Sequence, residues 1–335
     1  MKDILVEGEI FHNSRFQHGI FNISKNRFVD SDEKVSYRGT LIPAPINFHT
    51  HIGDSFIKEE PRGGIPEVVG PAGFKMRQLE LANGKIVRAG MRASVEYMKR
   101  VGTSAFVDFR ESGLRGIKAL PKLTGIDGFF LSRPSNDEDV KLLLEKSDGF
   151  GMSSISDYPL KWLESLSIKA HSAGKLFGIH FSENSREQCN SLIGLRPDFI
   201  VHATDASQED LRMIASEGIP VVVTPRSNIF YGKRQDYSRL VKSGLSVMIG
   251  TDNVFVTEPN IWEEASFLYR LQRSNGYISP DSILSMITEN PREFMRKRGL
   301  MGGRDRYVLF EGKELSSYQI ISKPNYYERR ILLNG

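Results

Sequence analysis

The sequence predicts an α/β protein: a closed (β/α)8 barrel, or TIM barrel, with a small β-sandwich formed by the two ends of the chain. Short apolar runs that end at Gly, Asp, Ser or His alternate with amphipathic stretches of helical period, and there are eight such runs. Eight β-then-α units match a closed barrel, whereas an open doubly wound sheet more often has about five or six strands. A chain of 335 residues is also long enough for one large domain with an appendage.

One barrel strand is expected at each apolar run, in chain order. The eight runs are residues 41–48, 103–109, 127–132, 148–154, 175–181, 197–203, 219–224 and 245–251. Good helix formers lie between several of them, at residues 82–101, 136–146, 159–174 and 207–218. Two further helices are expected after the eighth strand, at residues 260–276 and 279–299, and the second begins with a typical Ser-Pro start.

The two ends of the chain differ from this pattern, because they indicate short strands and turns without a helical period. The C-terminal segments of this kind are RYVLFEG, SSYQIIS and YYERRILLNG. We therefore expect residues 1–40 and 305–335 to form one small β domain and residues 41–304 to form the barrel.

Composition excludes several classes of function. The 45 Lys and Arg residues exceed the 41 Asp and Glu residues by only +4, and no basic block accompanies this excess, so nucleic acid is not an expected partner. The single cysteine, Cys189, cannot form an internal disulfide, and the start of the chain has no long apolar segment. We expect a cytoplasmic protein that binds a small-molecule substrate and no membrane; association into a homo-oligomer stays open.

Four of the seven histidines fall at the C-terminal ends of predicted strands: His49 and His51 in the first, His180 in the fifth and His202 in the sixth. In a parallel barrel this rim holds the active site. Residues two apart in a strand point the same way, so His49 and His51 can present two imidazoles to one ion. Asp252 ends the eighth strand, which neighbours the first in a closed barrel. A single such residue is usually structural, but the joint pattern indicates a metal site.

Several segments resemble the amidohydrolase superfamily, specifically its mononuclear aminohydrolase and chlorohydrolase branch, which includes cytosine and adenosine deaminases. LIPAPINFHTH resembles the first-strand His-x-His signature and HFSE the His-x-x-Glu motif. VHATDASQEDLRMIASEGIPVVVTPRSN resembles the sixth-to-seventh strand segment, IGTDN the eighth-strand Asp, and ITENPREFM the late Thr-x-Asn-Pro helix. The similarity runs in order along the whole chain. It departs at Ala44, where the family usually has Gly, and at NVFVTEPNIWEE, which lacks the family's run of Asn residues.

The resemblance implies one divalent metal ion that activates a water molecule. The implied ligands are His49, His51, His180 and Asp252. Zn²⁺ is the expected ion, with Fe²⁺, Mn²⁺ and Ni²⁺ as alternatives, because imidazole and carboxylate ligands suit all of them. A second metal is not expected, because residues 148–154 offer neither the lysine nor the glutamate that bridges two metals in related enzymes.

The resemblance also assigns the catalytic residues Glu183, His202 and Asp252. Glu183 is the expected general acid and base. Without the neighbouring histidines it would be interpreted as an acidic residue at a helix start. His202 is expected to hydrogen-bond the water or the substrate instead of binding the metal.

The expected reaction is hydrolytic deamination of an aminated heterocycle, such as a purine or pyrimidine base or a nucleoside, with release of ammonia. The alternatives are hydrolysis of another C–N bond, as in an amide or amidine, or of a C–halogen bond, and a non-catalytic metal- or ligand-binding barrel. The substrate-binding residues expected at the rim are Arg110, Asp157, Arg226 and Asn228. Arg226 could instead pair with a carboxylate and hold its loop. The Gly/Pro-rich residues 54–78 predict a lid, with a mobile surface loop as the alternative.

Overall fold

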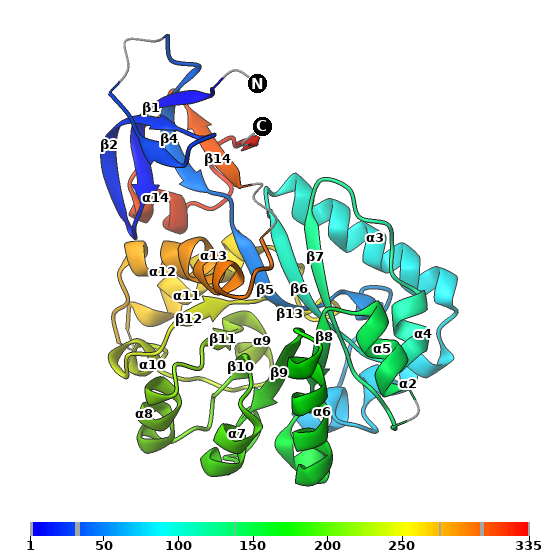
Figure 1. Ribbon diagram of the computed structural model, residues 1–335. Coiled ribbons are helices and arrows are strands. Elements are labelled where there is room, and N and C mark those ends of the chain that lie inside the picture. Colours follow the sequence, from blue (N-terminus) through cyan, green and yellow to red (C-terminus); the bar gives the residue numbers. More distant parts are fainter. Residues whose placement is uncertain (1–2, 31–33, 138, 275, 302–304, 334–335) are drawn as a thin grey trace.

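Each of the eight predicted barrel runs contains a strand of one parallel sheet in the computed structural model (Figure 1), which describes residues 3–30, 34–137, 139–274, 276–301 and 305–333. Its strands are β5 (Ile46–His51), β6 (Ala105–Arg110), β7 (Asp127–Ser132), β8 (Gly149–Met152), β9 (Leu176–Phe181), β10 (Phe199–His202), β11 (Val221–Val223), β12 (Val247–Ile249) and β13 (Asp252–Asn253). They follow one another in chain order across the sheet, except that β13 lies beside β5. Some residues of the two predicted domains, and single residues of the helices predicted over 136–146 and 260–276, lie outside the described residues. They are residues 1–2, 31–33, 138, 275, 302–304 and 334–335.

The predicted eighth strand consists of two pieces, β12 and β13, and it leads the sheet back to its first strand. Between these pieces the Thr251 amide donates a hydrogen bond to the His49 carbonyl of β5. Asp252 and Asn253 then pair with Thr50 and His51. The curved sheet therefore places the end of β5 directly beside Asp252.

Helices surround this sheet (Figure 1). They are α1 (Ile65–Val69), α2 (Phe74–Leu81), α3 (Gly84–Arg100), α4 (Gly113–Lys118), α5 (Val140–Lys146), α6 (Leu160–Ser172), α7 (Cys189–Leu195), α8 (Gln208–Ser216), α9 (Pro225–Phe230), α10 (Ser238–Lys242), α11 (Ile261–Gln272), α12 (Pro280–Ile287) and α13 (Glu289–Lys297), with 3-10 turns η1 (Ile52–Asp54) and η2 (Ile155–Asp157). Helices α1 and α2 lie over the C-terminal rim of the sheet. The helix expected over residues 279–299 is two helices, α12 and α13. Pro291 has no N–H to donate to the preceding turn, which explains the break near Thr288.

The two ends of the chain form one six-stranded sheet, whereas the sequence predicted a sandwich. Its strands are β1 (Leu5–His12), β2 (Arg15–Asn22), β3 (Arg27–Phe28), β4 (Tyr37–Pro43), β14 (Arg306–Glu311) and β15 (Arg330–Leu333), in the order β15-β14-β4-β1-β2-β3. The segment SSYQIIS is not a strand but helix α14 (Ser317–Ser322). Ser316 and Gln319 form a capping box there, a local signal that outweighs the β-branched content of the segment.

Aromatic side chains fill the interior of the barrel sheet beneath its C-terminal rim. Phe48 and Phe199 pack edge to face with ring centroids 5.2 Å apart, and Phe109 lies 4.6 Å from the His49 ring. The rim histidines therefore lie on an apolar floor, which explains their burial. No helix among the described residues is long and apolar enough to cross a membrane.

Candidate active site

The strand ends bring the predicted metal ligands together. His49 and His51 come from β5, His180 from β9 and Asp252 from β13, and all four side chains are buried. The pairing of β5 with β6 shifts its register between Asn47 and Thr50. Such an irregularity changes the direction in which side chains point. Here Phe48 packs in the barrel interior, while His49 and His51 of the same strand face the site.

The nitrogen and oxygen atoms of these residues converge on one point. His49 Nε2 and His180 Nε2 are 3.1 Å apart, and Asp252 Oδ1 lies 3.4 Å from Nε2 of both His49 and His51. The ligand atoms of the three histidines all lie within 4.8 Å of one another. Such a set of lone pairs fits a cation better than it fits a hydrogen-bond network.

Burial keeps the histidines in the form that binds a metal. It lowers the pKa of His49 from 6.5 to about 3, and it lowers the pKa of His180 well below its ordinary value. Both imidazoles are therefore neutral near pH 7, with a free lone pair. His49 Nδ1 is buried without a hydrogen-bond partner among the described atoms. Burial alone would raise the pKa of Asp252, but the neighbouring His49, His202 and His51 hold that pKa well below 3.8.

Glu183, in the loop after β9, and His202, the last residue of β10, form a second part of the site. Glu183 Oε1 lies 3.5 Å from His202 Nε2, and the Thr224 hydroxyl lies 3.2 Å from His202 Nδ1. Burial raises the pKa of the Glu183 carboxyl. His202 has a φ of 76° and Asp252 a φ of 63°, a backbone region that non-glycine residues rarely adopt and that is concentrated at functional sites.

A cavity of about 190 Å³ opens over these residues. His51, His180, Glu183, His202 and Asp252 form part of its wall. The predicted lid contributes several residues between 65 and 75, and the loops after β8 and β9 complete the enclosure. The cavity is therefore a pocket for a small molecule, with the proposed chemistry at its base.

Only one of the four predicted substrate-binding residues, Asp157, lines this cavity. Arg110 lies beneath the rim, where its guanidinium pairs with Asp108 and Glu111. It packs so closely over Gly53 that a side chain at position 53 would collide with it. The structure thus gives Arg110 a place in a buried ion network.

Arg226 and Asn228 also lie outside the cavity wall. Arg226 donates to Glu264 at 2.6 Å and to Glu258 at 2.8 Å, which matches the loop-holding alternative. Asn228 is buried and accepts a hydrogen bond from the Tyr237 hydroxyl. Both residues therefore support the loops behind the site.

Ser227 lies in the predicted PRSN motif, whereas no motif indicated Lys75 or Arg133, and all three residues have clear places at the site. Ser227 donates to Asp252 Oδ2 at 2.5 Å and so orients the carboxylate. Lys75, on lid helix α2, and Arg133, after β7, both line the cavity. Arg133 Nε bonds the Gly151 carbonyl, and within the described residues its guanidinium pairs with no carboxylate. The position of Arg133 directly after a barrel strand was the one sequence signal available.

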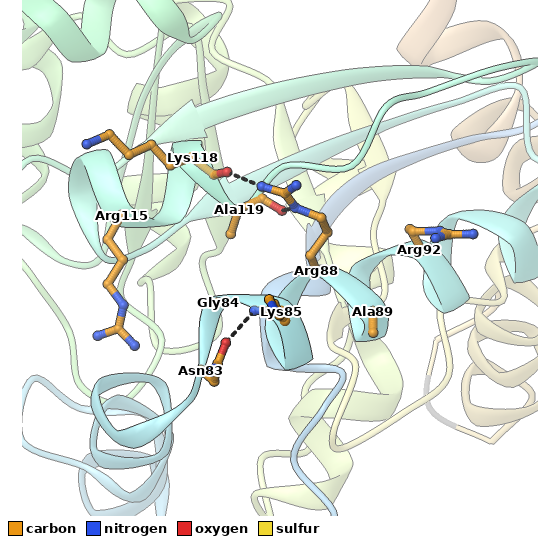
Figure 2. Close-up of a pocket in the computed structure, with 9 residues that line it drawn as sticks. All are labelled: Asn83, Gly84, Lys85, Arg88, Ala89, Arg92, Arg115, Lys118 and Ala119. Carbon is orange, nitrogen blue, oxygen red and sulfur yellow. Dashed lines mark hydrogen bonds between the residues drawn. The ribbon is translucent and has the colours of Figure 1, made fainter.

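A larger cavity, of about 660 Å³, lies away from the rim between α3 and α4 (Figure 2). It is lined by Lys85, Arg88, Arg92, Arg115 and Lys118 but by no histidine or carboxylate. Figure 2 shows Arg92 and Lys118 extending away from each other, while Arg88 is bonded to backbone carbonyls. This surface lacks the groups that hydrolysis requires, so the smaller cavity is the candidate active site.

Comparisons with known proteins agree with this geometry. The model of the Amidohydrolase family matches residues 40–299. A protein of Archaeoglobus fulgidus named "Putative aminohydrolase" is 32% identical over 268 residues, which are 79% of this chain and 74% of that protein. The 5-methylthioadenosine/S-adenosylhomocysteine deaminase of Caldicellulosiruptor saccharolyticus is 26% identical over 331 residues, covering 86% of this chain and 74% of its own.

A solved structure, N-isopropylammelide isopropylaminohydrolase from Burkholderia multivorans, superposes with a TM-score of 0.72 at 16% identity. The superposition covers 100% of this chain and 97% of that chain. At this identity the match establishes a shared fold.

Proposed function

The chain belongs to the amidohydrolase family, as its motifs predicted, and we propose that it is a metal-dependent deaminase of an aminated heterocycle. It is a hydrolase that acts on carbon–nitrogen bonds other than peptide bonds. The observation that carries the proposal is the combination of converging ligand atoms with Glu183 in the wall of the same cavity. A purine or pyrimidine base, a nucleoside or a related compound is the proposed substrate.

His49, His51, His180 and Asp252 would hold one divalent ion, with Zn²⁺ the proposed species. When bound, such an ion acts as a Lewis acid and makes water nucleophilic at neutral pH. The neutral imidazoles and the ionised Asp252 give a donor set that suits it. Ser227 fixes the second oxygen of Asp252, so that Oδ1 stays directed at the histidines.

Glu183 is the proposed proton carrier. Because burial raises its pKa, the carboxyl exchanges a proton more readily near neutral pH than an exposed glutamate does. It would take a proton from the attacking water and deliver it to the ring nitrogen as the water oxygen bonds to the ring carbon. The second proton of that oxygen would then pass to the exocyclic amine, the bond from carbon to this nitrogen would break, and ammonia would leave with an oxo group formed on the ring. His202, 3.5 Å from Glu183, would hold this carboxylate and the reacting oxygen in place.

Arg133 and Asp157 are the proposed substrate contacts. Arg133 can donate hydrogen bonds to an oxo or anionic group of the substrate, because within the described residues its guanidinium pairs with no carboxylate. Asp157 accepts a hydrogen bond from Ser153 at 2.5 Å and keeps one oxygen for a substrate N–H or O–H.

The test is ammonia release from a panel of aminated bases and nucleosides, combined with metal analysis of the purified protein. We expect turnover on at least one compound, loss of turnover after metal removal, and loss of both metal and turnover in His180→Ala. Bound metal without turnover on any panel member would favour a non-catalytic binding barrel.

A further inference from the structure

Lid helix α2 carries one lysine that is buried at the rim of the barrel. Lys75 is 4% exposed, whereas Arg77, two residues further along the same helix, is exposed and bonds the Ala72 carbonyl. Removing an ammonium group from water is unfavourable unless partners compensate for the lost hydration. The partners of Lys75 therefore indicate what its burial achieves.

The Lys75 ammonium bridges two barrel strand ends. Its Nζ lies 2.5 Å from Glu111 Oε1, directly after β6, and 3.7 Å from Asp54 Oδ2, in the turn after β5. Asp54 in turn accepts hydrogen bonds from Asn253 Nδ2 at 2.9 Å and from the Val254 amide at 2.9 Å. One side chain from the lid is thus connected to β5, β6 and the segment after β13.

The same oxygen of Glu111 that contacts Lys75 also contacts a proposed metal ligand. Glu111 Oε1 lies 2.6 Å from His51 Nδ1, while Arg110 holds Oε2 at 2.7 Å. The Phe109 carbonyl lies 3.1 Å from His51 Nδ1 as well. The Phe109 carbonyl is the hydrogen-bond acceptor at Nδ1, and the Glu111 charge beside it also favours the tautomer that carries its proton there, which leaves the Nε2 lone pair on the side of Asp252.

Docking of α2 does not depend on Lys75 alone. Arg115 on α4 donates to the carbonyls of Leu79 at 3.0 Å and Glu80 at 3.1 Å, at the C-terminal end of α2 where helix carbonyls lack partners. The lid is therefore anchored from outside the site by Arg115. Lys75 adds a connection that leads into the site.

We propose that Lys75 is a positioning residue: docking of the lid places its ammonium on Glu111, and Glu111 then fixes the His51 imidazole with Nε2 directed at the metal position. This inference rests on the proposed metal site. Its consequence is that the ligand set is fully ordered only when α2 is docked over the cavity, so lid closure and metal retention are coupled.

The experiment measures zinc affinity without any substrate. Metal-stripped wild type, Lys75→Met and the matched control Arg77→Met are titrated with Zn²⁺ in competition with a chromophoric chelator. We expect Lys75→Met to bind Zn²⁺ about 10–100-fold more weakly, the range typical for loss of a group that orients a metal ligand. Arg77→Met removes a cation from the exposed side of the same helix and should stay within about twofold of wild type.

A double-variant cycle tests the route through Glu111. Glu111→Gln should weaken Zn²⁺ binding, and Lys75→Met/Glu111→Gln should be no weaker than the worse single variant, because both changes break one chain of contacts. The double variant also leaves neither of these two charges unpaired, so it tests the link if Lys75→Met alone does not fold. Circular dichroism and thermal unfolding establish folding. Cleavage by a glutamate-specific protease at the exposed Glu59 and Glu67 should be faster in folded Lys75→Met, which reports the lid.

Unchanged zinc affinity in folded Lys75→Met would overturn the inference, and so would additive losses in the double variant. A raised KM with unchanged zinc affinity would make Lys75 a substrate contact instead. If wild type itself bound no Zn²⁺, the proposed function would fail at the metal site, and that result differs from failure of the Lys75 link alone.

Discussion

Glu183→Gln isolates proton transfer from metal binding. The substitution keeps the shape of the side chain and removes its ability to exchange a proton. Glu183 lines the cavity, and its Oε1 lies 3.5 Å from His202 Nε2. The described atoms also contain a second group that could hold an ion, formed by His180, Glu183 and His202. The variant therefore decides whether Glu183 carries protons or binds metal.

The expected loss of kcat is at least about 100-fold. A positioned general acid or base contributes about 10²–10⁴-fold, which corresponds to about 2.7–5.5 kcal/mol of activation free energy. KM should change only a few-fold, because glutamine fills the same volume. Metal content should equal that of wild type, because the four proposed ligands are untouched.

The assay follows ammonia release under saturating substrate, alongside metal analysis of the same preparation. Glu209→Gln, at an exposed glutamate in the first turn of α8, is the matched control and should retain wild-type rates. Near-normal turnover in Glu183→Gln would refute the proton-carrier assignment. Loss of metal in this variant would instead make Glu183 a ligand of the second group.

Three other perturbations probe the wall, the backbone and the charge of the site. Arg133→Met should raise KM about 10–100-fold with unchanged zinc affinity, because Arg133 lines the cavity and a charge-assisted hydrogen bond contributes about 1.5–3 kcal/mol. Steady-state kinetics on the identified substrate check this prediction. Gly250→Ala places a Cβ 2.5 Å from His49 Cβ, so we expect about 1–3 kcal/mol of destabilisation and weaker zinc binding. Gly194→Ala, in helix α7 with open space around it, should neither destabilise the protein nor weaken zinc binding. Thermal unfolding and chelator competition measure both effects. In metal-free protein, burial lowers the pKa of His49 to about 3, against 6.5 for the free side chain, so the unfolded chain binds more protons between these two values. The free energy of unfolding should therefore fall as the pH drops from about 6.5 to about 3. Urea titrations across this range check the prediction, and a flat profile would contradict the burial of a neutral His49.

The strand-end histidines could be predicted because two general rules fix their place. Parallel strands present their carboxyl ends at one rim, and alternation aims residues two apart in the same direction. His49, His51 and His180 satisfy the first rule and the pair His49 and His51 the second, and the structure brings the ligand atoms of all three within 4.8 Å.

The sequence did not determine which face of strand β6 points into the barrel. Arg110 follows a barrel strand, but Val107 and Phe109 of that strand point into the barrel, so Arg110 shares the opposite face with Phe106 and Asp108. The strand sequence AFVDFR does not indicate which of its two faces points inward, because both faces are buried. The expected substrate contact therefore became part of an ion network.

Lys75 could not be predicted for a different reason. It lies in a Gly/Pro-rich connection, and its burial depends on where α2 docks, which no local pattern determines. The helix α14 shows the reverse situation: its capping box was visible in the letters SSYQ, and β propensity was given too much weight there.

The charges buried around the rim give an independent argument for a divalent cation. Four buried carboxylates lie there, those of Asp54, Asp108, Glu111 and Asp252. Two buried cations, Lys75 and Arg110, face them, which leaves an excess of two negative charges when all four are ionised and the histidines are neutral. Burial raises the pKa of Asp54 to about 6, while Lys75 opposes this rise and the nearby Glu111 carboxylate adds to it. One divalent ion among His49, His51, His180 and Asp252 would offset it, and loss of the Lys75 charge would enlarge it to three. On charge alone, this larger excess would strengthen cation binding, so weaker zinc binding in Lys75→Met would report the lost positioning of His51 through Glu111.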